Sequence, residues 1–358
     1  MAPQPVSGAA TRCAIALDAR QTNQMSNGMK TYVRELVARL PRVASDLDFI
    51  TIETPVPNAS WREQVSLPVR LRRSGAALVH FMSLYAPRWP RMRYVYTIHD
   101  LIHRRFPEYF SWKIPPYYRF VAGPVARGAA AVITDAWATI PDLERFLNVS
   151  PERIRVVPLG VSEAFVLNDL GRTVRGAAAR ATFGLTRPFF LYAGNHRPHK
   201  NLATLVAAWQ ALSEACDLVI TEDGPLPSDE DRFAKSNGRI VRTGHVSRAE
   251  LVDLYAACAG AVQPSLFEGF GLAVLEAWSA GAPVAVAQTP TLLEVAGNAA
   301  LTFPPMDANA LTKALEMMLR DAGAVEELRR RGRERAAAFS WDETARQTAA
   351  VYRECLCR

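Results

Sequence analysis

Short runs of apolar residues alternate with longer segments of helical periodicity along the first half of the chain. Residues 13–18 form an apolar run with polar neighbours, as expected for a buried parallel strand. After Gly28, apolar residues recur at helical spacing over residues 31–40, which predicts an amphipathic helix and completes a βα unit. Further strands are expected at residues 47–52, 78–82, 94–98 and 129–134, and a short helix at residues 141–147.

The same alternation restarts in the second half. Residues 189–194 form an apolar run that ends at a glycine, and residues 202–213 have helical periodicity. Two such series predict an α/β protein with two Rossmann-like domains and a ligand at the carboxyl ends of their strands. The polar segment 167–187, which contains glycines, is the expected linker, and residues 341–355 form a further amphipathic helix. Further strands are expected at residues 217–221, 240–243, 260–263 and 283–287.

Length and composition agree with a globular protein of two domains. A chain of 358 residues with 49% hydrophobic residues exceeds what one hydrophobic core usually serves. The best apolar run, residues 272–287, contains Glu276 and Pro283, so we expect no segment to span a membrane. Residues 1–10 lack a basic stretch followed by an apolar one, so we expect no cleaved secretion signal and a cytoplasmic protein.

The formal net charge of +7 indicates an anionic partner, such as a phosphorylated substrate or a phospholipid surface. Zinc-finger spacing, an aromatic RNA-binding signature and a basic helix with heptads are all absent from the sequence, so we expect no nucleic-acid binding. The five cysteines form no C-x-x-C pair and are expected to be reduced. The six histidines lack paired metal-ligand spacing, and the D-x-D triplets at residues 46–48 and 229–231 lie in polar stretches. We therefore expect no metal and no other cofactor.

The segment of residues 265–276 carries two carboxylates on either side of a glycine-containing turn. Glu268 lies in the turn, and Glu276 follows an apolar run about two helical turns further along. Gly269 and Gly271 let backbone N–H groups approach an anion, and the start of a helix adds a positive dipole end. This E-x7-E pattern is typical of a sugar-nucleotide site. The alternative is an ordinary turn whose glutamates are solvated or paired with arginines.

A second candidate loop, residues 194–201, also follows an expected strand and precedes a helix. Arg197 and Lys200 provide fixed positive charge there, which suits a phosphate group. Taken alone, the loop has the alternative of being solvated, with both side chains facing water. Its occurrence in the same half of the chain as the E-x7-E segment favours phosphate binding.

Several motifs occur in the order and spacing of one known family. They are Gly28, Tyr32, Val33 and Leu36 in a G-x-x-x-Y-V-x-x-L pattern, T-I-H-D at residues 97–100, P-E-R-I at 151–154, V-P-L-G-V at 157–161, P-H-K-N at 198–201, and the E-x7-E segment. Over nearly its whole length the chain resembles glycosyltransferase family 4, the retaining enzymes that transfer a sugar from a nucleotide donor.

The resemblance implies the GT-B fold, in which two Rossmann-like domains face each other across a cleft. Residues 1–170 would form the N-terminal, acceptor-binding domain, and residues 171–340 the C-terminal domain that binds the nucleotide sugar. A C-terminal helix over residues 341–358 would cross back to the N-terminal domain.

The resemblance also implies roles for individual residues. Glu276 would bind the donor ribose, Glu268 the hydroxyls of the transferred sugar, and Arg197 with Lys200 the diphosphate. His99 matches the histidine near the anomeric centre. The implied catalytic residues are His99, Glu268, Arg197 and Lys200. The implied donor-binding residues are Gly28, Gly194, Asn195, Val246, Gly269, Phe270, Gly271, Leu272, Ala273 and Glu276.

The chain departs from the family pattern at three places. Asn27 stands where many relatives have the first glycine of a pair, and Asn195 stands where others have arginine. Residues 134–137, T-D-A-W, replace the usual Thr-x-Ser. The first two departures concern phosphate contacts, and the third concerns a position near the acceptor.

Basic and aromatic side chains are mixed over residues 87–120, a composition that suits a lipid interface unless the rings belong to the core. Within the family the chain resembles bacterial mannosyltransferases that build exopolysaccharide or O-antigen units on polyprenyl diphosphate. We therefore expect GDP-mannose as the donor, a lipid-linked saccharide as the acceptor, and a cytoplasmic enzyme peripheral to the inner face of the membrane. A UDP-sugar donor is the alternative. A sugar-nucleotide epimerase or hydrolase on the same fold is the alternative of another class.

Overall fold

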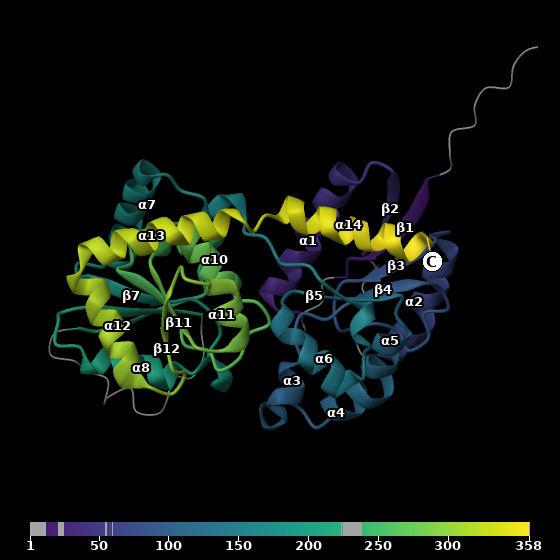
Figure 1. Ribbon diagram of the computed structural model, residues 1–358, viewed down its shortest axis with the longest axis horizontal. Coiled ribbons are helices and arrows are strands. Elements are labelled where there is room, and N and C mark those ends of the chain that lie inside the picture. Colours follow the sequence, from purple (N-terminus) through teal and green to yellow (C-terminus); the bar gives the residue numbers. More distant parts are fainter. Residues whose placement is uncertain are drawn as a thin grey trace, which may run out of the picture.

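The computed structural model describes residues 12–20, 25–53, 56–58, 60–222, 224 and 238–357. Within these residues the chain forms two parallel β-sheets of six strands each, with helices packed on them in two halves of the molecule (Figure 1). The predicted α/β fold with two Rossmann-like units is thereby confirmed. The D-x-D triplet at residues 229–231 lies outside the described residues.

The first sheet has the strand order β2-β1-β3-β4-β5-β6. Its strands are β1 (Cys13–Asp18), β2 (Leu47–Ile52), β3 (Leu78–Phe81), β4 (Tyr94–Thr97), β5 (Ala131–Thr134) and β6 (Ile154–Val156). The helices of this half are α1 (Asn27–Val43), α2 (Trp61–Arg73), α3 (Ile102–Arg105), α4 (Ile114–Tyr117), α5 (Gly123–Gly128) and α6 (Ile140–Leu147). Ile15 and Leu17 of β1 belong to the core that includes α1, whereas Ala16 belongs to the core that includes α2. Because both faces of the sheet are covered, β1 is apolar over consecutive positions.

The second sheet has the strand order β12-β11-β10-β7-β8-β9. Its strands are β7 (Phe189–Tyr192), β8 (Asp217–Thr221), β9 (Ile240–Gly244), β10 (Gly260–Gln263), β11 (Val284–Ala287) and β12 (Leu301–Phe303). The helices of this half are α7 (Asp169–Phe183), α8 (Leu202–Ala211), α9 (Arg248–Ala257), α10 (Leu272–Ser279), α11 (Pro290–Ala296), α12 (Ala308–Arg320) and α13 (Ala322–Ala337). No helix among the described residues is both long and apolar enough to cross a bilayer.

The strands expected from the sequence are found with bounds within two residues of those expected. The sequence pattern missed β6 and β12, since each has three residues and is too short to produce a recognisable alternation. Helix α1 starts before the expected residue 31, because the Ser26 side chain accepts a hydrogen bond from the backbone N–H of Met29 and caps the helix there.

The segment expected to be a linker, residues 167–187, is for the most part helix α7 rather than an irregular connection. Asn168 caps its start by accepting the N–H of Gly171, and Gly184 ends it in a left-handed conformation. Gly176 lies where α7 meets α9, and an added Cβ would be 3.4 Å from the Cα of Ala257. The glycines taken as signs of a linker therefore serve helix capping and helix packing. The domain boundaries at residues 170 and 340 stay predictions.

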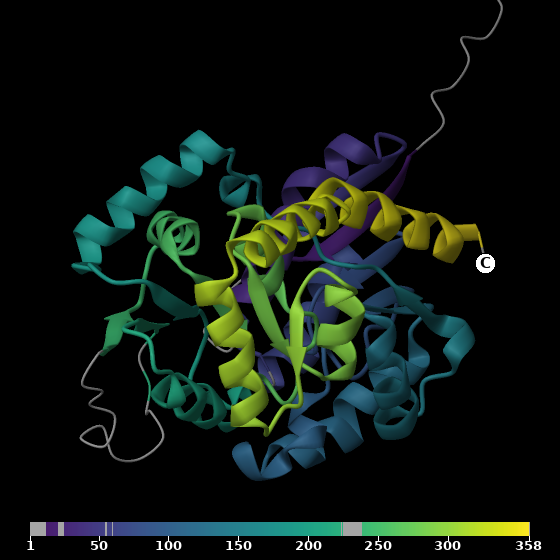
Figure 2. The same ribbon diagram turned by 60° about the vertical axis from the view of Figure 1, so that its left-hand side comes forward.

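The C-terminal helix α14 (Trp341–Cys357) packs on α1 and the first sheet, so it crosses back as expected (Figures 1 and 2). The chain passes between the two halves twice, and the two passing segments pair with each other near Val161 and Ser340. The N–H of Val161 donates to the carbonyl of Phe339, and Val161 forms a β-bridge with Ser340. Farther along α14, Tyr352 is hydrogen-bonded through its hydroxyl to Nδ1 of His80 in β3, at 2.6 Å. The two halves are therefore joined by two paired stretches of backbone.

Gly160 is the point at which these two stretches come closest. An added Cβ would lie 2.1 Å from the backbone nitrogen of Trp341, so the backbones must separate if the residue has a side chain. We expect Gly160→Ala to lower the free energy of unfolding by about 1–3 kcal/mol, the usual cost of overpacking. Urea denaturation would measure the change. Gly323→Ala is the matched control, because its Cβ would meet only Asp321 Oδ1 at 3.5 Å. Equal stability of the two variants would contradict the prediction.

Candidate active site

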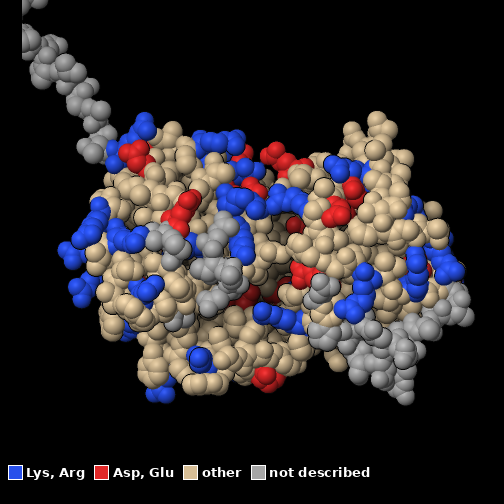
Figure 3. Space-filling view, turned by 180° about the vertical axis from the view of Figure 1, so that it is seen from behind, with Lys and Arg blue, Asp and Glu red and all other residues tan. Residues whose placement is uncertain are grey.

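The predicted donor-binding loops follow two neighbouring strands of the second sheet, β7 and β10. The strand order reverses between them, which is where ligands bind in open α/β sheets. The N–H of Leu266 in the loop after β10 donates to the carbonyl of His199 in the loop after β7, at 2.8 Å. The surface is hollowed between the two halves of the molecule, with basic and acidic side chains in the hollow (Figure 3).

The turn before α10 depends on glycine at its last position. Gly271 has a φ of +105°, which L side chains rarely adopt, and it is the N-cap of α10. No side chain of the described residues caps this end, so the first N–H groups of α10 are left for another partner. The ring of Phe270 is buried and packs 5.8 Å from that of Phe339. Phe270 therefore anchors the turn, and only its backbone is placed to meet a donor.

Glu268 and Lys200 form an ion pair between the two loops, with Nζ 2.6 Å from Oε1. Gln263 at the end of β10 donates to the same carboxylate oxygen. Burial alone would raise the pKa of Glu268, but the Lys200 ammonium outweighs it and holds that pKa below its usual value. An ammonium has three N–H donors, so this pairing leaves donors on Lys200 for a phosphate oxygen.

The side chains of two asparagines shape the loop of residues 194–201. Asn195 accepts the N–H of Arg197 with Oδ1, and its carbonyl accepts the hydroxyl of Tyr192 at 2.6 Å. Asn201 has a left-handed backbone, with φ at +57°, and its amide donates to the carbonyl of Pro264 at 3.1 Å. Asn195 replaces the arginine of the family pattern with a residue that stabilises the loop from within.

Arg197 is exposed and faces the first half of the molecule. Its guanidinium lies over the ring of Phe110, 5.4 Å from the ring centroid. Phe106 packs close by, with its ring 6.3 Å from the rings of both His199 and Phe267. Aromatic residues of the basic and aromatic segment therefore touch both donor loops from the opposite side of the cleft.

Glu276 lies in the second turn of α10, below the Gly271 turn. Burial raises the pKa of Glu276 to about 7, against a partial offset from Arg248 at the start of α9. Val246 comes two residues before Arg248 and packs its half-buried side chain on the core. Val246, a predicted donor-binding residue, and Glu276, the predicted ribose-binding residue, thus lie on neighbouring elements.

Two helices from different halves begin at the same place in the cleft. An added Cβ at Gly28, in the first turn of α1, would lie 3.6 Å from Cδ1 of Leu272, the first residue of α10. The positive dipole ends of α1 and α10 therefore converge, which favours an anion between them. The backbone N–H groups of Leu272 and Ala273 belong to this end of α10.

Gly269 brings the two halves into contact beside this point. An added Cβ would lie 2.9 Å from the carbonyl oxygen of His99 and 3.0 Å from Cβ of Asp100. The loop after β4 therefore packs directly on the turn before α10, and only glycine leaves room. The structure thus brings His99 next to the turn that carries Glu268.

The ring of His99 is held on two sides. Its Nδ1 is 2.8 Å from Oδ2 of Asp135, and the ring of Tyr32 meets it edge to face with centroids 4.6 Å apart. Burial lowers the pKa of His99, but the Asp135 carboxylate outweighs it and raises that pKa above its usual value. Asp135 lies in the T-D-A-W departure, and no motif of the sequence assigned a role to it. The signal that could have found it is its position directly after β5, the neighbour of β4.

Glu294 in α11 is a second residue that sequence analysis missed. Its carboxylate accepts the backbone N–H groups of Trp137 and Ala138 across the cleft, at 2.9 and 2.8 Å. Arg335 of α13 donates to the carbonyls of Glu294 and Val295 and so fixes the end of α11. Nothing in the sequence indicates this contact, because its partners are more than 150 residues apart.

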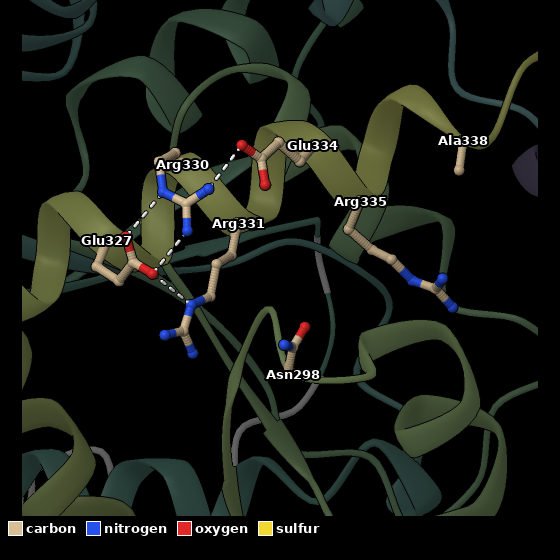
Figure 4. Close-up of a pocket in the computed structure, with 7 residues that line it drawn as sticks. All are labelled: Asn298, Glu327, Arg330, Arg331, Glu334, Arg335 and Ala338. Carbon is tan, nitrogen blue, oxygen red and sulfur yellow. Dashed lines mark hydrogen bonds and ion pairs between the residues drawn. The ribbon is translucent and has the colours of Figure 1, made fainter.

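A cavity of about 440 Å³ lies against α13 and contains none of the predicted site residues (Figure 4). Arg330 and Arg331 both form ion pairs with Glu327, and Arg330 also pairs with Glu334. The charged side chains that line the cavity therefore largely compensate one another. We do not assign a ligand to it. The lining residues are Asn298, Glu327, Arg330, Arg331, Glu334, Arg335 and Ala338.

The chemistry of the cleft fits a phosphorylated sugar. Lys200 and the starts of α1 and α10 offer positive charge and N–H donors, while Glu268 and Glu276 offer acceptors for hydroxyl groups. In the described part of the chain no three His, Cys, Asp or Glu side chains gather as they would around a metal ion. The roles of the individual site residues stay predictions.

Two facing Rossmann-like units, joined by a helix that crosses back, define the GT-B fold. Residues 53–165 match the family model described as Glycosyltransferase Family 4, and residues 187–321 match the model described as Glycosyl transferases group 1. The chain belongs to glycosyltransferase family 4, as the motifs predicted.

Two relatives and one solved structure illustrate the similarity. O-antigen chain mannosyltransferase B from Escherichia coli is 29% identical over 73% of this chain and 70% of that protein. MMP alpha-(1->4)-mannosyltransferase from Mycolicibacterium hassiacum is 31% identical over 65% of this chain, and the match spans 56% of that protein. Sucrose-phosphate synthase from Thermosynechococcus elongatus has the same fold, with a TM-score of 0.74 and 22% identity over 97% of this chain and 100% of that one.

Glu276 makes the stability of the ligand-free protein depend on pH. Burial raises the pKa of Glu276 from 4.5 to about 7, so the folded protein favours the protonated carboxyl group. The stability that depends on this proton is complete below about pH 4.5 and is lost as the pH rises to about 7. Glu276→Gln stays neutral, so we expect its melting temperature to rise relative to wild type between about pH 5 and pH 8. Thermal denaturation across this range measures the difference. Glu316→Gln on α12 is the control, and a constant difference for Glu276→Gln would contradict the prediction.

Proposed function

We propose that this glycosyltransferase moves mannose from GDP-mannose to a lipid-linked saccharide at the cytoplasmic face of a membrane. The observation that carries the proposal is the convergence, in one cleft, of the starts of α1 and α10 with the Lys200–Glu268 pair. A diphosphate placed between the two helix ends has positive dipoles and an ammonium directed at it. His99 lies across the cleft from the diphosphate position, beside the Gly269 turn.

The reaction has one main requirement, which is stabilisation of the leaving group. The bond between the anomeric carbon and the diphosphate oxygen breaks, and its electron pair goes to that oxygen. The acceptor hydroxyl attacks the same face of the sugar, and its proton passes to the departing phosphate. Lys200 and the N–H groups of α10 oppose the charge that develops on the diphosphate, and such a donor contributes about 2.7–4 kcal/mol when it is preorganised.

The two carboxyl groups hold the rest of the donor in this proposal. Glu268 is kept ionised by Lys200, so it accepts hydrogen bonds from hydroxyls of the transferred sugar. Glu276 lies in the second turn of α10 and accepts from the ribose hydroxyls. We favour positioning over nucleophilic attack for Glu268, because its ion pair with Lys200 lowers its basicity.

Mannose as the transferred sugar is supported by relatives that carry the name mannosyltransferase. They include the proteins from Escherichia coli and Mycolicibacterium hassiacum, and the first is named for the O-antigen chain. These names, together with the T-I-H-D-L-I and P-H-K-N sequences of this chain, favour GDP-mannose over a UDP-sugar.

A lipid-linked acceptor is supported by four exposed rings of the first half, Trp61, Trp89, Trp112 and Phe120, each with a basic residue next to it. We call these eight residues together the aromatic–basic surface. These rings are exposed to 72%, 65%, 79% and 62%, respectively. Each has a guanidinium or ammonium within 6 Å of its centroid, supplied by Arg62, Arg88, Lys113 and Arg119. Exposed rings beside cations suit the headgroup region of an anionic membrane. Tyr94, Tyr96 and Tyr118 are buried, so part of the predicted segment belongs to the core instead.

Turnover with defined donors tests the proposed reaction. We expect GDP release from GDP-mannose when a polyprenyl-diphosphate-linked saccharide is present, and slower release without it. Lys200→Gln should lower kcat on the order of 10²- to 10³-fold, because one preorganised donor to the leaving group is lost. Lys313→Gln, an exposed lysine on α12, is the matched control.

The same assay separates the alternatives. Turnover with UDP-glucose, UDP-galactose or UDP-N-acetylglucosamine alone would overturn the proposed donor. Release of free sugar at an undiminished rate without acceptor would indicate a hydrolase. An equal loss in Lys200→Gln and Lys313→Gln would contradict the role given to Lys200.

Sedimentation with lipid vesicles tests the aromatic–basic surface. We expect binding to vesicles of phosphatidylglycerol and phosphatidylcholine that weakens with salt. The double variant Arg88→Gln and Lys113→Gln should lose about 2 kcal/mol of binding, about 1 kcal/mol for each charge. Arg330→Gln with Arg331→Gln on α13 removes the same charge from the other half of the molecule and should leave binding close to wild type. Equal weakening of both pairs would mean that net charge alone, and not this surface, attracts the membrane.

A further inference from the structure

A buried carboxyl group stands directly behind the candidate catalytic histidine. His99 follows β4 and Asp135 follows β5, and these strands are neighbours with Thr97 opposite Ile133. Their carboxyl ends therefore lie side by side, and Nδ1 of His99 is 2.8 Å from Oδ2 of Asp135. The side chains of His99 and Asp135 are only 11% and 2% exposed.

Each residue of the His99–Asp135 pair has one further polar atom that could form a hydrogen bond. Nε2 of His99 and Oδ1 of Asp135 are both buried, and neither has a hydrogen-bond partner among the described residues. Because Nδ1 must carry its proton to donate to a carboxylate, Nε2 is the ring atom left for a ligand. A buried polar atom without a partner costs free energy unless something fills it.

The surroundings hold the pair in one arrangement. The ring of Tyr32 packs edge to face on His99, and its hydroxyl is 3.1 Å from Oγ1 of Thr97. The turn after Asp135 is fixed from the opposite half by Glu294, which accepts the N–H groups of Trp137 and Ala138. The carbonyl of His99 lies against Gly269, so this contact restrains the backbone of His99.

We propose that Asp135 is a positioning residue for the transfer reaction, which accepts Nδ1–H of His99 and stabilises a positive charge on the ring, so that Nε2–H donates to an oxygen of the bound donor. This inference rests on the proposed function, because it assumes that the donor sugar occupies the cleft beside His99. A charge-assisted bond from a cationic imidazole is stronger than one from a neutral ring, and it opposes the negative charge of the leaving diphosphate.

The other titratable groups around His99 do not replace Asp135. Asp100 of the same loop adds a weaker attraction, as does the backbone carbonyl of Met82. His80 of β3 is buried between Tyr352 and Thr97, and burial lowers its pKa to about 3, so it stays neutral. The hydroxyl of Tyr32 is also neutral, since burial raises its pKa. Asp135 is therefore the residue whose removal should change the protonation of His99.

Asp135→Asn tests the proposal in two measurements. In ¹H–¹³C spectra of the histidine Cε1 groups, assigned with His99→Gln, the pKa of His99 should fall in the variant. The chain has six histidines, so their signals can be followed individually. With donor and acceptor, kcat should fall on the order of a hundredfold, with a smaller change in KM, and the alkaline limb of the kcat profile should move to lower pH.

Asp142→Asn is the matched control. Asp142 is a buried carboxyl group of the same half, bound by Arg105 through two hydrogen bonds of 2.9 and 2.7 Å. It should lower stability without moving the pKa of His99. If Asp135→Asn does not fold, Asp135→Ser provides the same comparison with a smaller side chain.

The outcomes distinguish this inference from the proposed function. An unchanged pKa of His99 in Asp135→Asn, or the same fall in Asp142→Asn, would overturn the positioning role. An unchanged kcat profile would do so as well. The titration of His99 requires no substrate, so a fall in its pKa would support the pair even if GDP-mannose proved not to be the donor.

Discussion

The candidate site depends on one close approach between the two halves of the molecule, at Gly269. A side chain there would collide with the His99 carbonyl, so the turn before α10 and the loop after β4 touch through backbone atoms. Two other contacts between the halves lie near this point. The start of α1 meets the start of α10 at Gly28 and Leu272, and the ring of Phe106 packs near the rings of His199 and Phe267. Interfaces packed at this distance adopt discrete arrangements rather than sliding continuously, so a small shift here would change every contact across the cleft.

The charges within the cleft are arranged to favour an anion without leaving an isolated buried charge. Lys200 is paired with Glu268, which offsets the cost of removing either charge from water. Among the described residues Glu276 forms no ion pair, and burial outweighs the attraction of Arg248 and raises its pKa to about 7. The remaining positive potential comes from the helix ends, which carry partial charge and keep their direction without side-chain ordering. A diphosphate would then meet a site that is already oriented.

The connections between the halves explain how this arrangement is held. The two crossing segments pair at Val161 and Ser340, and Gly160 allows them to approach closely. A second connection runs from Arg335 of α13 to α11, and from Glu294 of α11 to the turn after Asp135. The helix that enters the crossing is thus linked, through two sets of hydrogen bonds, to the carboxyl group behind His99. These hydrogen bonds connect α13 to the turn that follows Asp135.

Local sequence patterns were enough to predict most of the elements and the family. Apolar runs, helical periodicity and glycine turns placed most strands and helices, because these signals depend on residues a few positions apart. Motif spacing also identified Glu268, Glu276 and Lys200 as candidate site residues. It misjudged residues 167–187, since the glycines of a capped, closely packed helix resemble those of a linker. Which distant side chains meet became clear from the packing of the strands and helices. The bond between His99 and Asp135 depends on the adjacency of β4 and β5, and that of Glu294 with Ala138 joins residues 156 positions apart. Strand order and closure of the cleft are properties of the whole packed chain, and no local pattern encodes them.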